Sequence, residues 1–115
     1  MSLAEYFATA AAFERPIFER VRAQLDHLDP LRVEAVTIGI LFKRVRTFAE
    51  LRPMRERVRL GMLFSAPLES PRFVRTERLG GSRMAFFVDL RHPDDVDDEV
   101  RDWLTDAYFS SPISR

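Results

Sequence analysis

The sequence predicts an α+β domain in which N-terminal and C-terminal helices pack on a mostly antiparallel sheet of about five strands. Near both ends of the chain, apolar residues recur every three or four positions, which is typical of helices with one buried side. Between these ends the apolar residues alternate with polar ones, as in half-buried strands. Two alternating segments meet at Gly80-Gly81, a pair that supplies the positive φ angles of a tight hairpin turn.

The composition predicts one domain covering residues 1–115. The chain is 46% hydrophobic and 31% charged, as in ordinary soluble globular proteins. It contains no cysteine, which excludes disulfides, thiolate nucleophiles and thiolate-bound metals. No stretch is apolar for long enough to span a membrane, and the N-terminus lacks the basic and apolar regions of a signal peptide. We therefore expect a cytoplasmic protein that does not associate with membranes.

Two helices are expected before the sheet. Ser2, followed three residues later by Glu5, forms a capping box and predicts a short helix that ends near Ala8. A longer helix should begin at Phe13 or Glu14, because Pro16 fits only its first turn. Its apolar stripe consists of Phe13, Ile17, Val21, Leu25 and Leu28.

The expected strands are VEAVTI and ILFKRV on either side of Gly39, then RVRLGMLFS, RFVRTERL and SRMAFFVDL. A last helix should run from Pro93 to about Phe109, with Asp94 and Asp95 complementing the positive end of its dipole. The periodicity predicts that eight residues are buried together: Val58, Leu60, Met62, Met84, Phe86, Val88, Val100 and Trp103.

Large apolar residues also fall on the outward face of the predicted sheet. By the alternation, they are Leu41, Leu63, Phe73 and Phe87. Such residues on an outward face suggest that something covers it. The N-terminal helix is the simplest cover, and a second subunit or a ligand are the alternatives.

The net charge of zero conceals a segregation along the chain. Residues 43–59 contain seven basic and two acidic side chains, whereas residues 89–106 contain eight acidic side chains and two arginines. The basic segment is either a solvated edge that pairs in part with the acidic helix, of the same or a neighbouring subunit, or a polyanion-binding surface. The overall pI of about 6.7 disfavours nucleic acid. The anion-binding candidates are Lys43, Arg44, Arg46, Arg52 and Arg55.

No pattern in the sequence predicts catalysis. His27 and His92 lie at helix ends, where a histidine is usually a cap or a surface residue. There is no phosphate-binding glycine loop and no nucleophile elbow, and the acidic residues 94–99 lack the spacing of a calcium loop. We expect no catalytic residue, no metal and no cofactor, and keep an enzyme with an unrecognised site only as an alternative.

Three stretches of the chain resemble a known family. They are the segment from Thr37 through ILF to TFAELRP, then ESPRFVRTERL, and HPDDVDDEVRDWLTDAY, which is the most specific of the three. Over essentially its whole length the chain is similar to the bacterial domain-of-unknown-function family 5655, sometimes labelled a predicted transport protein. The resemblance implies a fold and a bacterial origin, but it implies no chemistry, because a fold does not fix a function.

We therefore expect a non-enzymatic binding or interaction module whose partner is a protein or a small molecule. Homodimer formation would bury the outward apolar residues. The ligand or interface candidates are Thr37, Phe48, Leu63 and Phe87. The alternative function is binding of nucleic acid or another polyanion through residues 43–59.

Overall fold

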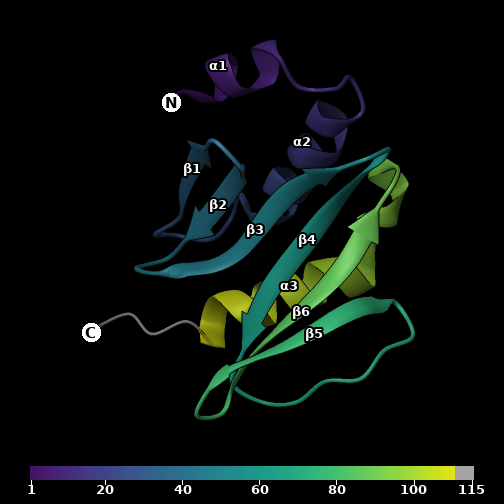
Figure 1. Cartoon of the computed structure of the whole chain (residues 1–115). Coiled ribbons are helices and arrows are strands. Elements are labelled where there is room, and N and C mark those ends of the chain that lie inside the picture. Colours follow the sequence, from purple (N-terminus) through teal and green to yellow (C-terminus); the bar gives the residue numbers. More distant parts are fainter. Residues whose placement is uncertain (111–115) are drawn as a thin grey trace.

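One six-stranded sheet organises residues 1–110, the part of the chain that the computed structural model describes. Its strands are β1 (Arg32–Val36), β2 (Gly39–Lys43), β3 (Thr47–Met54), β4 (Arg57–Phe64), β5 (Phe73–Gly80) and β6 (Arg83–Leu90). They lie in the order β1-β2-β3-β4-β6-β5, and every neighbouring pair is antiparallel (Figure 1). The predicted α+β class is confirmed, with six strands rather than about five.

The additional strand is β3, which the alternation of the sequence does not reveal. Its adjacent residues Phe48 and Ala49 are both buried, so apolar and polar positions do not alternate cleanly there. Pro53, which lacks a backbone N–H, lies opposite Val58 next to the turn into β4. The register also shifts where β3 begins to pair with β2. These three irregularities hide a strand that lies near the middle of the sheet.

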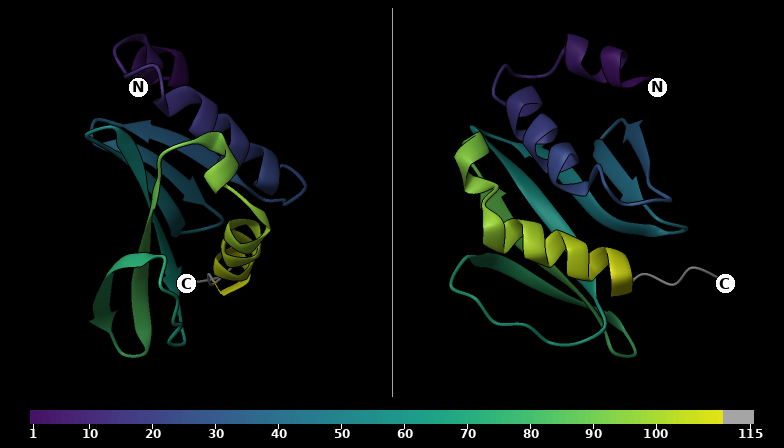
Figure 2. Two further views of the ribbon diagram at one scale, coloured as in Figure 1. Left: turned by 90° about the vertical axis from the view of Figure 1, so that its right-hand side faces the viewer. Right: turned by 180° about the vertical axis from the view of Figure 1, so that it is seen from behind.

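The long helices of the described chain lie on the same face of the sheet. The helices are α1 (Leu3–Ala8), α2 (Glu14–Leu25), the 3-10 turn η1 (Pro93–Asp95) and α3 (Asp98–Ser110). Figure 2 shows α2 and α3 packed against one side of the strands. The expectation that the N-terminal helix covers the outward apolar residues is therefore wrong. Within residues 1–110, no helix covers the opposite face, which we call the open face.

The predicted core is confirmed. Val58, Leu60, Met62, Phe86, Val88 and Val100 are buried in one cluster, and Met84 and Trp103 pack against it half-buried. Phe73 belongs to this side as well, although alternation predicts it on the outward face. Its ring centroid lies 4.9 Å from those of Phe86 and Trp103. The register of β5 shifts between Phe73 and Arg75, and this shift reverses the side on which Phe73 projects.

The helix cap and the hairpin turn form where the sequence predicts them, but the C-terminal helix differs from the prediction. Ser2 and Glu5 form the capping box of α1, and Gly80 and Gly81 adopt φ angles of 123° and 57° in the β5–β6 turn. The predicted C-terminal helix is divided, because Val96 leaves the helical conformation and is fully buried. The helix restarts at α3, where the Asp97 carboxylate accepts a hydrogen bond of 3.1 Å from the backbone N–H of Val100.

Replacement of Phe86 should test this arrangement. Phe86 is 1% exposed and contacts the rings of Phe64 and Phe73. We expect Phe86→Ala to lower the free energy of unfolding by about 3–5 kcal/mol, through lost burial and the cavity left behind. Phe87→Ala is the matched control, because this neighbouring ring lies half-buried on the open face and should contribute less. Denaturant unfolding measures both, and an equal or reversed order would mean that the two faces are misassigned.

Candidate interaction surface on the open sheet face

The open face is built around a row of residues that crosses four strands. The strand register places Glu50 of β3 opposite Gly61 of β4, Gly61 opposite Phe87 of β6, and Phe87 opposite Arg75 of β5. Side chains of paired residues project to the same side of a sheet. From β3 to β5 the row therefore passes from a carboxylate through a glycine and an aromatic ring to a guanidinium. Beyond Glu50 the register adds Leu41 of β2 and Glu34 of β1.

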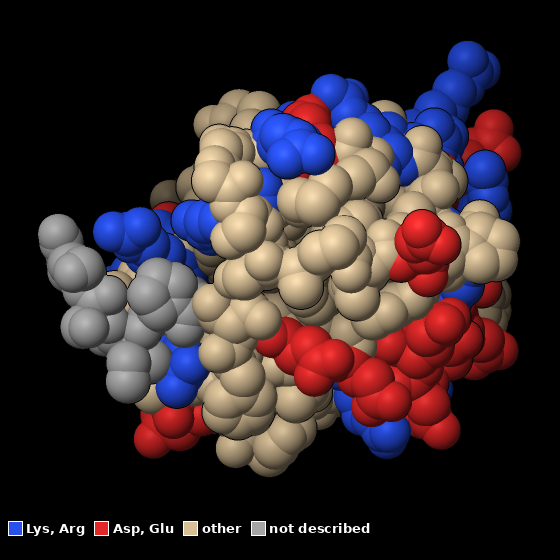
Figure 3. Space-filling model, turned by 90° about the horizontal axis from the view of Figure 1, so that it is seen from below, with Lys and Arg blue, Asp and Glu red and all other residues tan. Residues whose placement is uncertain are grey.

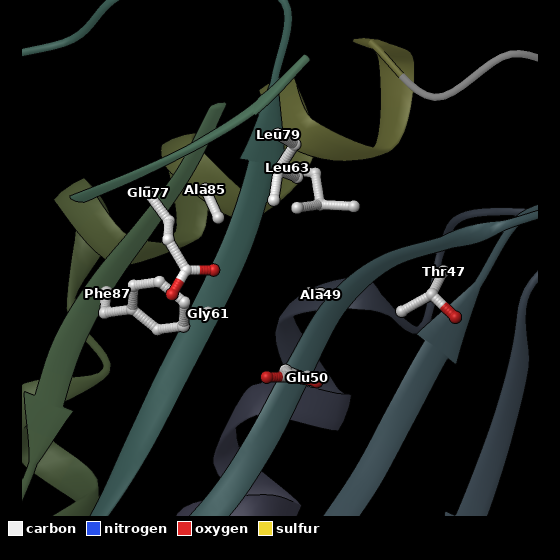
Figure 4. A pocket seen from close by; sticks show the side chains of 9 residues that line it. All are labelled: Thr47, Ala49, Glu50, Gly61, Leu63, Glu77, Leu79, Ala85 and Phe87. Atoms are coloured by element: carbon white, nitrogen blue, oxygen red, sulfur yellow. The ribbon is translucent and has the colours of Figure 1, made fainter. Parts of the chain in front are cut away.

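Gly61 makes room for the ring of Phe87. A Cβ atom at Gly61 would lie 2.8 Å from Cε1 of Phe87, which is closer than atoms can pack without movement. With glycine at this position, the ring lies against β4 at the edge of a shallow hollow of about 170 Å³. Leu63, Leu79 and Phe87 supply apolar surface to this hollow, and the side chains of Glu50 and Glu77 line it as well (Figure 4).

A second hollow of about 250 Å³ adjoins the first and shares Glu50, Glu77 and Phe87 with it. Arginine side chains dominate the rest of its lining. The residues that line it in addition to the shared ones are Arg52, Met54, Arg59 and Arg75. The open face thus has a partly apolar centre and a rim that carries both signs of charge.

The rim charges are held by local ion pairs. Nε of Arg52 lies 3.3 Å from a carboxylate oxygen of Glu50, and Arg75 contacts Glu77 on the same strand. The Arg75 guanidinium also lies 5.9 Å from the centroid of the Phe87 ring. The side chains of Arg52 and Arg75 are 50% and 58% exposed, so these pairs are weak and can exchange for other partners.

Asp89 binds two arginines at the end of the same face. Nε of Arg59 donates to Oδ1 over 2.8 Å, and Nε of Arg57 donates to Oδ2 over 2.9 Å. The hydrogen bond from Arg59 is the main cause that lowers the pKa of the Asp89 carboxyl below its usual value. The side chain of Asp89 is 13% exposed, so this cluster joins β4 to β6 in a partly dry environment.

The five anion-binding candidates do not converge. Lys43 pairs with Glu34 across β1 and β2 over 2.7 Å, and Arg52 pairs with Glu50. Arg44 lies over the rings of Tyr108 and Phe109 and donates to the Tyr108 carbonyl. The remaining two, Arg46 and Arg55, are exposed beyond opposite ends of β3.

The predicted pairing of the basic segment with the acidic helix is not found among the described residues. The segment instead uses acids of the sheet, which are Glu34, its own Glu50 and Asp89, the first residue of the acidic stretch. At the start of α3, the acids Asp97 and Glu99 bind Arg72, each over 3.0 Å. Figure 3 shows acidic side chains gathered towards one side of the face that it displays.

The structure brings together two of the four ligand or interface candidates. Leu63 and Phe87 line the first hollow. Thr37 is exposed in the turn between β1 and β2, away from this hollow. Phe48 is 1% exposed and packs edge-on against Tyr108, so its side chain belongs to the core and presents no surface to a partner.

Sequence reasoning did not identify the other residues of the row. Glu50 was hidden because β3 was not predicted, and Arg75 because the shift in β5 hides its partner. The signal for Gly61 was present, since a glycine inside an alternating strand often marks a close approach. The glycine alone does not show that the ring of Phe87 is the group that approaches it, because this depends on the pairing of β4 with β6.

The lining of the open face offers binding chemistry. It supplies apolar contact, carboxylates and guanidinium groups, and Thr47 adds a hydroxyl to the first hollow. Of the histidines, His92 caps η1 and His27 is exposed beyond the end of α2. Within residues 1–110, no group of three or more His, Cys, Asp or Glu side chains is arranged to hold a metal ion. No helix in the same range is long and apolar enough to cross a membrane.

The Asp89 cluster should contribute to stability in a pH-dependent way. We expect Asp89→Asn to lower the free energy of unfolding at neutral pH by roughly 1–3 kcal/mol, because three hydrogen bonds to a charged acceptor are weakened or lost. The folded pKa of Asp89 is lowered, so this contribution is present above the unfolded pKa of about 3.9. It should disappear as the pH falls through the folded value.

Urea unfolding of the wild-type protein and the variant between neutral pH and pH 3 measures this difference. Asp106→Asn, the same change at an exposed position of α3, is the control and should have little effect. A difference that stays constant down to the lowest pH would contradict the role of the Asp89 charge.

Comparison with known proteins identifies the family but no characterised relative. No curated protein and no solved structure matches the chain significantly. One family model matches residues 3–111, and its description is "Domain of unknown function (DUF5655)". The match covers every element of the described fold, including the four strands that carry the row from Glu50 to Arg75. The chain is therefore a member of the DUF5655 family.

Proposed function

We propose that the protein is a non-enzymatic interaction module that binds a protein partner on its open face. The observation that supports this proposal is the uncovered, partly apolar centre around Leu63 and Phe87, surrounded by charges of both signs. Protein interfaces have this organisation, with an apolar core, arginine and aromatic side chains, and a polar rim. A cytoplasmic protein of bacterial origin remains our expectation from the sequence.

The arrangement of charge favours a protein partner over a polyanion. A polyanion site needs several cations that face one groove and are free to neutralise phosphates. Here Arg57 and Arg59 share Asp89, and Lys43 is paired with Glu34. The second hollow contains arginines, but Glu50 and Glu77 line it too and would repel phosphate.

A small probe can test the open face without knowledge of the natural partner. Benzylammonium combines an aromatic ring with a positive charge, which suits the apolar wall and the two carboxylates of the first hollow. We expect weak, saturable shifts of the amide NMR signals of Gly61, Leu63, Ala85 and Phe87 when it is titrated into dilute protein.

Leu63→Asn should weaken these shifts, because it removes part of the apolar wall. Ile38→Asn is the control, since Ile38 is an exposed aliphatic residue in the β1–β2 turn. Shifts that map elsewhere, or an equal response of the two variants, would contradict the assignment of the open face as a binding surface.

A further inference from the structure

The open face carries its charges in an order that matches a second copy of itself. We infer that two copies of this chain pack open face to open face about a two-fold axis that runs parallel to the strands, between β4 and β6. This inference rests on the proposed function, because it names the partner of the same surface. It is carried by the strand register, which fixes the positions of the charges relative to such an axis.

A two-fold axis that lies between two stacked sheets, parallel to their strands, reverses the order of the strands in the partner copy. A residue on one side of the axis then meets the residue at the mirrored position on the other side of its partner. The part of the row from Glu50 to Arg75 has its centre between Gly61 and Phe87. The register continues the row beyond Glu50 to Leu41 and Glu34, which extend past the partner's edge strand β5. Glu50 of one copy therefore faces Arg75 of the partner subunit, and its Arg75 faces the partner's Glu50.

The neighbouring rows obey the same rule. On one side, Arg59 pairs with Asp89 across β4 and β6, so the axis places Arg59 opposite the partner's Asp89. On the other side, Leu63 pairs with Ala85, so an apolar side chain faces the partner's Ala85. Beside the axis, Arg59 meets the partner's Asp89 and apolar groups meet one another, and further out Glu50 meets the partner's Arg75.

An axis perpendicular to the strands does not give this complementarity. If it ran along the central row, Glu50 would face the partner's Glu50 and Arg75 would face the partner's Arg75. Like charges placed opposite each other across an interface cost several kcal/mol. Between these two axes through the centre of the row, the order of charges therefore selects the one parallel to the strands.

The strand order limits the size of such a contact. About an axis between β4 and β6, the strands β3, β4, β6 and β5 of the two copies overlap, and at about 4.8 Å per strand and about 3.3 Å for each of eight residues they give a face of roughly 500 Å². A standard interface buries about 800 Å² on each partner, so we expect a weak dimer that forms at high protein concentration. Packed sheets lie about 10 Å apart. Long Glu and Arg side chains on both faces can span this distance, while Leu63 and Phe87 fill the centre.

Charge exchange at two positions tests the inference. Light scattering over a wide protein concentration range should show that the wild-type chain dimerises. Glu50→Arg should raise the dissociation constant at least tenfold, because the arginine introduced at this position faces the partner's Arg75. Arg75→Glu should do the same, since it places two carboxylates opposite each other.

Two combinations should restore association. The double variant E50R/R75E regains opposite charges at both contacts within one kind of chain. An equimolar mixture of E50R and R75E should form a mixed dimer, because the arginines at positions 50 and 75 of one variant then face the glutamates at positions 75 and 50 of the other. The controls are Glu69→Arg and Arg78→Glu, equal charge changes at exposed positions outside the row, which should leave association unchanged. Circular dichroism establishes that every variant is folded.

The outcomes separate this inference from the proposed function. A wild-type chain that stays monomeric at the highest concentrations overturns the inference. If benzylammonium still maps to the open face, the proposed function survives that result, and if it does not, both are rejected. A dimer that neither single variant weakens uses another surface and also overturns the inference. Loss of association that neither the double variant nor the mixture restores refutes the pairing of Glu50 with the partner's Arg75.

Discussion

The pairing of β4 with β6 determines which residues of this protein are buried and which are presented. Seven residue pairs join the two strands, from Val58 opposite Leu90 to Phe64 opposite Met84. A shift by one residue would exchange the two faces and move the apolar set into water. Asp89 opposes such a shift on the open face, because its two oxygens bind Arg57 and Arg59 of the opposite strand. The same register brings Gly61 next to Phe87 and so forms the first hollow.

The one-sided packing of the helices follows from how the apolar stripes of α2 and α3 combine. Ile17, Val21 and Leu25 of α2 and Val100 and Leu104 of α3 are all fully buried in one cluster with the strands. The two helices contact each other as well as the sheet, so together they cover its apolar side. Within the described chain, both long helices are used on that side, and the open face retains a half-buried Leu63 and Phe87.

The sequence predicted those parts of the fold in which local chemistry and periodicity agree. The capping box at Ser2, the turn at Gly80-Gly81 and the buried face of β4 and β6 are of this kind. β3 was not predicted, because its buried Phe48 and Ala49 are adjacent and Pro53 interrupts its end. A helical stripe shows that a helix buries one side, but it does not show which face of a sheet the helix covers. The open face could therefore be suspected from the sequence, while its central row depends on pairings between distant segments.

Part of the basic segment 43–59 is neutralised by acids within the sheet, and this pairing bears on what the open face can do. Basic residues of the segment 43–59 are paired with acids that lie beside them in the sheet, such as Glu34, Glu50 and Asp89. Exposed pairs contribute roughly 0–1 kcal/mol each, so the fold loses little when one of them exchanges its partner. The pairs at Glu50 and Arg75 are of this exposed kind, whereas the Asp89 cluster is more buried and maintains the register. The open face can therefore offer its outer charges to a partner while the inner cluster keeps the strands in place.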